Sequence, residues 1–132
     1  ESLQQKKDLN QAVESSNSSL VFKSDKGKIE LKLDSSDLAY IQSDGNYVEI
    51  YYFNQGTIQK KLIRNTLKNV ALILPAYIFI RCHNRFIVNG HFIQKVEGNA
   101  RNLILHLKEI PDEIPVSRAK VKSISTFLES LS

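Results

Sequence analysis

Apolar and polar residues alternate along much of the chain from Leu20 onward, which is typical of strands that bury one face. The stretch LVFKSDKGKIELKL (20–33) has an Asp-Lys-Gly turn in its middle and predicts a β-hairpin. The stretch DLAYIQSDGNYVEIYYF (37–53) predicts two more strands around a turn at Ser43–Asn46. Gly56 supplies a further tight turn, because glycine adopts a positive φ without strain. The residues that share one face of the strand before Gly56 are Val48, Ile50 and Tyr52.

From Lys60 to Leu74 a helical spacing replaces the alternation, and Pro75 makes a continuation of this helix unfavourable. The apolar side of the predicted helix consists of Leu62, Leu67, Val70 and Ile73 or Leu74. Strands are then predicted for YIFIRC (77–82), RFIV (85–88), HFIQKV (91–96) and LILHL (103–107), with the last two joined as a hairpin by the loop EGNARN.

The two ends of the chain differ in pattern. After a loop with Pro111 and Pro115, Ser117 is a predicted N-cap of a last helix, because its hydroxyl can accept from a first-turn N–H. The buried stripe of that helix is predicted to be Val121, Ile124, Leu128 and Leu131. Residues 1–19 have weak helical spacing that gives way to serine and asparagine, and we expect a linker or frayed helix from a longer protein. The pattern thus predicts a mainly β domain with a short central helix and a C-terminal helix.

The distribution of charge adds a functional hint that the net charge of +4 gives only weakly. Between Glu49 and Glu97 the 132-residue chain has no acidic residue. The basic residues in that window are Lys60, Lys61, Arg64, Lys68, Arg81, Arg85 and Lys95. A second acid-free window holds Arg118, Lys120 and Lys122. Segregated positive charge suits a surface that faces phosphates. A basic surface with no particular target is the alternative.

The chemistry of an enzyme or a metal site is not supported by the sequence. Cys82 is the only cysteine, so no internal disulfide forms, and a reducing cytoplasm is the simplest assumption. Cys82 and His83 point to opposite faces of a strand, which leaves a partly buried core thiol as the favoured role of the cysteine. The spacing of the three histidines matches no zinc motif, and the glycines form no phosphate loop. We therefore expect no catalysis, metal or cofactor.

A polar cluster in IRCHNRFIVN (80–89) is the strongest local candidate for a binding site. It contains Arg81, His83, Asn84 and Arg85 between two apolar runs. Asparagine can bond adenine in a bidentate manner, and arginine can do the same to guanine. The alternative is that Asn84 and Arg85 cap a turn and face water, and the residue types alone leave the two interpretations open.

The sequence from Val21 to Leu128 resembles the LytTR family of bacterial DNA-binding domains, the output modules of response regulators. Four stretches carry the resemblance: LAYIQSDGNYVEIYY, LIRNTLKNVALIL with FIRCHNRFIVNGHFIQKV, NLILHL, and IPVSRAKVKSI. The resemblance implies elongated, mostly antiparallel sheets packed side by side. It also implies that loops, and not a recognition helix, enter successive major grooves of DNA.

The resemblance further implies which residues bind DNA. In the first loop, Ser43 to Tyr47, they are Asn46 and Tyr47. In the second loop they are Asn84 as a base reader, with Arg81, His83 and Arg85 on phosphates or bases. At the start of the last helix they are Ser117, Arg118, Lys120 and Lys122. Arg118 and Lys120 are alternatives for the base-reading role, because Ala119 occupies one of the positions that can carry it. The three loops are expected along one edge of the domain.

The partners implied are double-stranded DNA with promoter repeats, a second copy paired on that DNA, and a receiver or membrane-sensor region before residue 1, with a histidine kinase upstream. The location implied is the cytoplasm, with a membrane tether as an option. RNA binding is less favoured, because alternation buries some of the clustered tyrosines. The alternative function is a β-rich ligand- or protein-interaction module with an incidental basic face.

Overall fold

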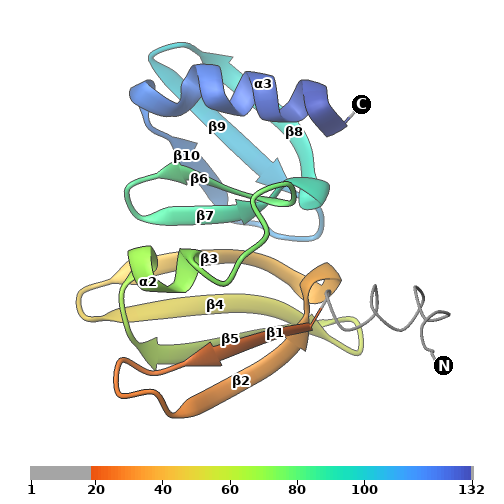
Figure 1. Ribbon diagram of the computed structural model, residues 1–132. Helices are drawn as coiled ribbons and strands as arrows, with labels where there is room; N and C mark the ends of the chain where they lie inside the picture. Colours follow the sequence, from red (N-terminus) through yellow and green to blue (C-terminus); the bar gives the residue numbers. More distant parts are fainter. Residues whose placement is uncertain (1–18, 132) are drawn as a thin grey trace, which may run out of the picture.

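The computed structural model describes residues 19–131, with side chains described as far as residue 130. Its strands form three antiparallel sheets (Figure 1). The two-stranded sheet consists of β1 (Ser19–Lys23) and β2 (Ile29–Asp34). The five-stranded sheet has the order β5 (Thr57–Arg64), β4 (Tyr47–Asn54), β3 (Leu38–Asp44), β7 (Phe86–Asn89) and β6 (Phe79–His83). The three-stranded sheet has the order β10 (Glu113–Val116), β9 (Asn102–Leu107) and β8 (Ile93–Asn99).

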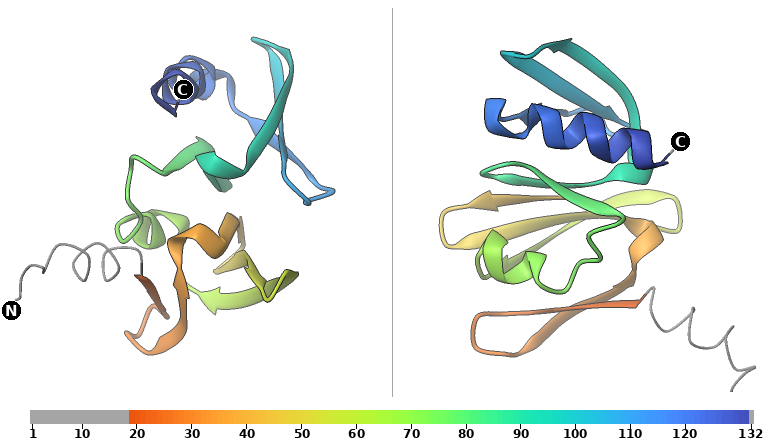
Figure 2. Two further views of the ribbon diagram at one scale, coloured as in Figure 1. Left: turned by 90° about the vertical axis from the view of Figure 1, so that its right-hand side faces the viewer. Right: turned by 45° about the horizontal axis from the view of Figure 1, so that its top comes forward.

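Two α-helices and three short 3₁₀ helices complete the part of the chain that the structure describes. They are α2 (Leu67–Ala71), α3 (Val121–Leu131), η1 (Ser35–Asp37), η2 (Gly90–Phe92) and η3 (Arg118–Lys120). Both α-helices lie on the same side of the molecule (Figure 2). The sheets follow one another along the long direction of the domain (Figure 1). The predicted class, mainly β with antiparallel sheets side by side, a short central helix and a C-terminal helix, is confirmed. Of the predicted linker at 1–19, all but Ser19 lies outside the described residues.

Strand β3 separates two hydrophobic cores, because neighbouring residues on a strand point to opposite faces. Ile41 belongs to the core under the β1–β2 hairpin and α2, together with Val48, Ile50 and Phe22. Tyr40 belongs to the core under β9, β10 and α3. Both side chains are at most 2% exposed, so this strand is covered on both faces.

The predicted helix from Lys60 to Leu74 is wrong in its first half. Residues up to Arg64 continue β5, where Ile63 is buried and Leu62 is 49% exposed. The helix is only α2, and the Thr66 hydroxyl caps it by accepting from the N–H of Asn69 at 3.1 Å. Leu62, Leu67 and Val70 fit a helical spacing. From Thr57 to Arg64, however, pairing with β4 satisfies the hydrogen-bonding groups of the backbone, so this part is a strand.

Two segments predicted as loops contribute residues to strands. The loop EGNARN shrinks to a two-residue turn at Ala100 and Arg101, because β8 and β9 extend to Asn99 and Asn102. The proline-containing segment before the last helix forms β10, which pairs with β9 alone and is an edge of its sheet. Pro115 is tolerated there because an edge strand has one side without a ladder.

The start of the last helix also differs from the prediction. The Ser117 hydroxyl makes no capping bond; its backbone carbonyl accepts from the Lys120 N–H at 2.8 Å, which closes η3. Helix α3 begins only at Val121. Of its predicted stripe, Ile124 is buried and Val121 and Leu128 are partly buried, whereas the Leu131 side chain lies outside the described residues.

Candidate nucleic-acid interface

One edge of the domain brings together the three predicted segments, which are far apart in sequence. It holds the β3–β4 turn at Asp44–Tyr47, the β6–β7 turn at His83–Phe86, and η3 with the first turn of α3. All three lie at the left of Figure 1. The prediction that these segments share one edge is confirmed. That they bind DNA stays a prediction at this point.

Hydrogen bonds join the first two turns directly. The Ser43 N–H donates to the Arg85 carbonyl at 2.9 Å. The Arg85 guanidinium donates back to the Ser43 carbonyl, with Nη2 at 3.2 Å and Nε at 3.4 Å. The two turns therefore form one unit, and Arg85 is the side chain that links them.

The third segment is fixed to the strand that leads into the second turn. The Ser117 N–H donates to the Cys82 carbonyl at 2.9 Å. The Cys82 side chain is fully buried beside this bond, with its Sγ atom 3.6 Å from the Pro115 carbonyl oxygen. Burial raises the pKa of the thiol to about 12, so the group is neutral near pH 7 and a poor nucleophile. Cys82 is a core residue, more deeply buried than predicted.

Two predicted contacts of the β6–β7 turn, the side chains of Arg81 and His83, bond within the turn. Arg81 Nη2 donates to the Asn84 carbonyl at 2.8 Å, and Arg81 Nε is buried without a hydrogen-bond partner among the described residues. The His83 Nδ1 accepts from the Arg85 N–H at 3.1 Å, and its ring stands edge-on to Phe86. These side chains set the shape of the turn.

Other predicted contacts are free to meet a partner. The side chains of Asn46 and Asn84 are exposed, and neither makes a hydrogen bond within the part of the chain that the structure describes. Arg118 and Lys122 are exposed as well, and neither has an ion pair there. Lys120 and Ser117 are partly buried. The edge thus presents two free amides and two free cations.

Sequence reasoning missed Arg64 as a member of this edge. It pairs with Tyr47 across β4 and β5, its guanidinium lies 5.9 Å from the centre of the Tyr47 ring, and it also approaches the Asp25 carboxylate at 3.4 Å. The sequence carried no clear signal for this position, because Lys60 to Leu74 fits a helical spacing and only the pairing of β5 with β4 places Arg64 opposite Tyr47. Asp44 is an exposed acidic residue of the first turn.

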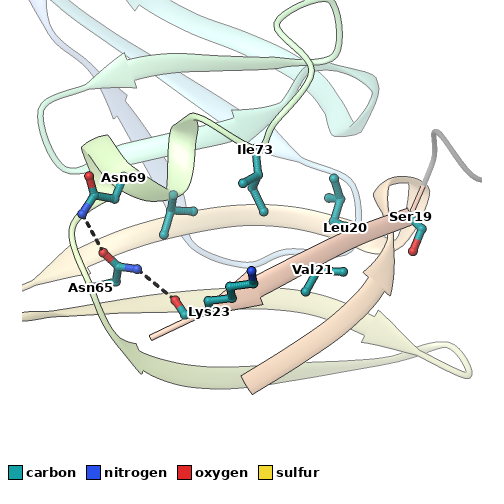
Figure 3. A pocket seen from close by; sticks show the side chains of 8 residues that line it. Ser19, Leu20, Val21, Lys23, Asn65, Asn69 and Ile73 are labelled. Carbon is teal, nitrogen blue, oxygen red and sulfur yellow. Dashed lines mark hydrogen bonds between the residues drawn. The ribbon is translucent and has the colours of Figure 1, made fainter. Parts of the chain in front are cut away.

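An asparagine network ties the same edge to the β1–β2 hairpin (Figure 3). Asn65 Nδ2 donates to the Lys23 carbonyl at 2.9 Å, Asn69 Nδ2 donates to Asn65 Oδ1 at 3.1 Å, and the Asn65 N–H donates to the Asn46 carbonyl at 3.1 Å. The hollow beside it is lined mostly by apolar or uncharged residues, with Lys23 as its one ionisable side chain. That lining offers no cluster of groups for catalysis or a metal.

The tyrosines do not form an exposed stacking surface. Tyr40 and Tyr51 stack on each other with ring centres 4.3 Å apart, and Tyr40 is only 2% exposed. Burial, the neighbouring Tyr51 and the Asp112 carboxylate all raise the pKa of Tyr40. Only Tyr47 is exposed at the edge. This arrangement does not favour the base-stacking platform of many RNA-binding proteins.

Comparisons with known proteins agree with this geometry. The family model of the LytTr DNA-binding domain matches residues 27–129. The transcriptional regulatory protein YpdB of Escherichia coli K12 is 48% identical over 56 residues, which are 42% of this chain and 23% of that protein. The sensory transduction protein LytT of Bacillus subtilis is 27% identical over 99 residues, 73% of this chain and 38% of that protein. The chain therefore covers less than half the length of either relative.

A solved structure shares the fold. It is the LytTr DNA-binding domain of a methyl-accepting/DNA response regulator from Bacillus cereus, with a TM-score of 0.67. The match is 20% identical and covers 84% of this chain and 96% of that one. Since the family model spans residues 27–129, which are most of the sequence, the chain belongs to the LytTr DNA-binding domain family.

Proposed function

We propose that the chain is the sequence-specific, double-stranded DNA-binding output domain of a bacterial transcriptional regulator, and that its three edge segments enter the major groove. The observation that carries the proposal is the joining of these segments, by hydrogen bonds, into one edge that presents free amides and free cations. A side chain that reads bases has to be accessible and carried on a backbone that is held in place. The Asn84 side chain is exposed, and its backbone carbonyl accepts from Arg81 Nη2.

The edge divides the work between bases and phosphates. Asn84 and Asn46 are the side chains for base edges, and Tyr47, next to Asn46 in sequence, has the Arg64 guanidinium over its ring. Arg118 and Lys122 are the phosphate contacts. Lys120, the alternative to Arg118 for the base-reading role, is then the candidate for a base contact from η3. Arg81, His83 and Arg85 position the turn from within. Phosphate contacts fix orientation and supply affinity, whereas base contacts supply sequence information.

The names of the relatives, which are those of regulatory and sensory transduction proteins, support a proposal for the wider setting. We infer that two copies pair on repeated half-sites in a promoter. We also infer that a receiver or membrane-sensor region, controlled by a histidine kinase, precedes this domain, and that the domain works in the cytoplasm. Among residues 19–131 no helix is long and apolar enough to cross a bilayer.

Selection of bound sequences from a random duplex pool tests the proposal. A sequence-specific domain should enrich one motif, and binding to it should weaken as salt rises, with a slope near −0.9 in log units per neutralised phosphate. Arg118→Ala and Lys122→Ala should each reduce that slope by about one unit or less. Lys108→Ala is the matched control, because Lys108 is exposed in the loop between β9 and β10, at the opposite end of β10 from Ser117.

Enrichment of no motif, with equal losses in all three variants, would instead favour an interaction module with an incidental basic surface. A motif bound without any contribution from Arg118 or Lys122 would move the phosphate contacts to another part of the domain.

A further inference from the structure

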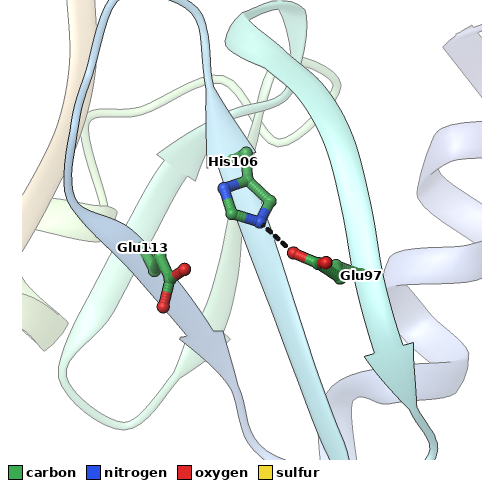
Figure 4. A group of neighbouring side chains, drawn as sticks. All are labelled: Glu97, His106 and Glu113. Atoms are coloured by element: carbon green, nitrogen blue, oxygen red, sulfur yellow. Dashed lines mark hydrogen bonds and ion pairs between the residues drawn. The ribbon is translucent and has the colours of Figure 1, made fainter.

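The outer face of the three-stranded sheet carries a cluster of three potential metal ligands, one from each strand. Glu97 comes from β8, His106 from β9 and Glu113 from β10 (Figure 4). His106 stands directly opposite Glu113 in the β9–β10 ladder. Glu97 stands opposite Ile104, two residues before His106, and therefore on the same face. The neighbouring Leu105 and Leu107 point into the core on the other face.

The three side chains converge closely. His106 Nε2 lies 2.7 Å from Glu97 Oε1. One ligand atom from each of the three residues lies within 4.8 Å of the others, and this is the one such group of His, Cys, Asp or Glu in the part of the chain that the structure describes. Around a tetrahedral ion with bonds of about 2.0–2.2 Å, ligand atoms are roughly 3.3 Å apart. Glu97 and Glu113 are exposed, so small rotations of their side chains close that difference.

We propose that Glu97, His106 and Glu113 form a Zn²⁺ site that clamps the three strands together. Imidazole nitrogen and carboxylate oxygen are ordinary zinc ligands, and a set of three leaves a fourth position for water. The mixed set is less suited to Ca²⁺ or Mg²⁺, which prefer oxygen ligands alone.

Two features bear on the strength of this site. His106 Nε2 is already bonded to Glu97 Oε1, so an ion between them displaces the proton that they share. Lys95 Nζ also lies 3.8 Å from Glu97 Oε2, and its positive charge opposes a second cation nearby. The Lys95 side chain is 64% exposed, so it can swing into solvent when the ion binds.

The clamp would act on a short edge strand. Strand β10 has four residues, pairs only with β9, and leads directly into Ser117 and η3. An ion held by Glu113 and His106 adds a bond between these strands that unfolding must break, so binding should raise the thermal midpoint of the domain.

Titration calorimetry of the full chain with zinc chloride tests the site, with thermal unfolding as a second readout. The test variants are Glu113→Gln and His106→Gln, which change ligands and keep size. The matched control is His91→Gln, because His91 is an exposed histidine on η2, outside the cluster. The proposal expects one ion per wild-type chain, an affinity at least about tenfold weaker in both cluster variants, and no change in the control.

Zinc should likewise raise the thermal midpoint of the wild type and of His91→Gln, but not of Glu113→Gln. Circular dichroism of each variant without zinc shows whether it is folded, so a loss of binding through misfolding is recognised. Absence of zinc binding in the wild type, or equal affinity in Glu113→Gln, would overturn the proposal and leave a Glu97–His106 ion pair only.

Discussion

Polar side chains have different roles within the β6–β7 turn, according to whether their polar atoms are already bonded. The Arg85 guanidinium is bonded to Ser43 and the Arg81 guanidinium to Asn84, whereas the Asn84 amide is free. The sequence shows four donor-rich residues in five positions, but it does not show which of their side chains form hydrogen bonds within the fold. Asn84 is therefore the side chain of this turn that we predict to read a base.

Asn84→Ala should reduce discrimination between the selected duplex and a mutated one. The loss of one bidentate base contact should cost about 1–3 kcal/mol on the selected duplex and much less on the other. The measurement is a fluorescence titration of both duplexes at two salt concentrations. Asn54→Ala is the control, because Asn54 is exposed at the opposite end of β4. Equal weakening on both duplexes, or none, would make Asn84 a turn residue.

A conservative substitution of Arg81 can show whether this side chain supports the turn or contacts a phosphate. If Arg81 supports the turn through Asn84, Arg81→Lys should weaken DNA binding nearly as much as Arg81→Ala, since lysine lacks the planar guanidinium. If Arg81 contacts a phosphate, Arg81→Lys should retain most of the affinity. Binding at one salt concentration, with the unfolding free energy of each variant, decides between them. We expect the first outcome, with a loss of stability in both variants.

At the scale of elements, most strands and turns were predictable, whereas β10 and the strand–helix boundary near Arg64 were not. The hairpins were predicted from alternation and turn residues, because local sequence determines both. Leu62 is compatible with both a helical and a strand spacing relative to Leu67. Only its pairing with Glu49 of β4 makes Leu62 a strand residue. Strand β10 was missed because a proline argues against a strand unless the strand is known to be an edge. The place of Arg64 in the candidate interface likewise depends on the pairing of β5 with β4, which lies outside the local sequence.

The β8–β9 hairpin depends on Gly98, which has a φ of 104°. A Cβ atom there would collide with the carbonyl oxygen of Asn102 across the turn. Gly98→Ala should therefore destabilise the domain by more than the cost of positive φ alone, which is about 1–2 kcal/mol. Gly27→Ala is the matched control: Gly27 has a φ of 86°, but open space surrounds its Cβ position. Urea unfolding of both variants measures the difference. Equal losses would mean that the hairpin relaxes around the methyl group.

At the scale of the whole molecule, the neutral groups buried around β3 make the fold sensitive to alkali. Burial raises the pKa of Cys82 from 9.0 to about 12. Burial and a hydrogen bond to Glu49 raise the pKa of Tyr51 from 10.0 to about 12. The folded state then keeps protons that the unfolded state loses, so stability is full below about pH 9 and falls as pH rises towards 12.

Urea unfolding from pH 7 to pH 11 should show this decline, and Cys82→Ala should make the decline shallower while lowering stability at pH 7 through the cavity it creates. A wild-type stability that stays constant to pH 11 would contradict the expected direction. So would an unchanged slope in Cys82→Ala, because the thiol is one of the groups held neutral.

Strand β3 has a consequence for how the domain opens. Because Tyr40 and Ile41 belong to different cores, neither core can separate from the five-stranded sheet without uncovering a face of β3. The amide hydrogens of Tyr40, Ile41 and Gln42 lie in a strand paired with β4 on one side and β7 on the other. These amides should exchange with deuterium only when the whole domain unfolds. Both ends of the molecule would then melt in a single cooperative step, although they are built on separate cores.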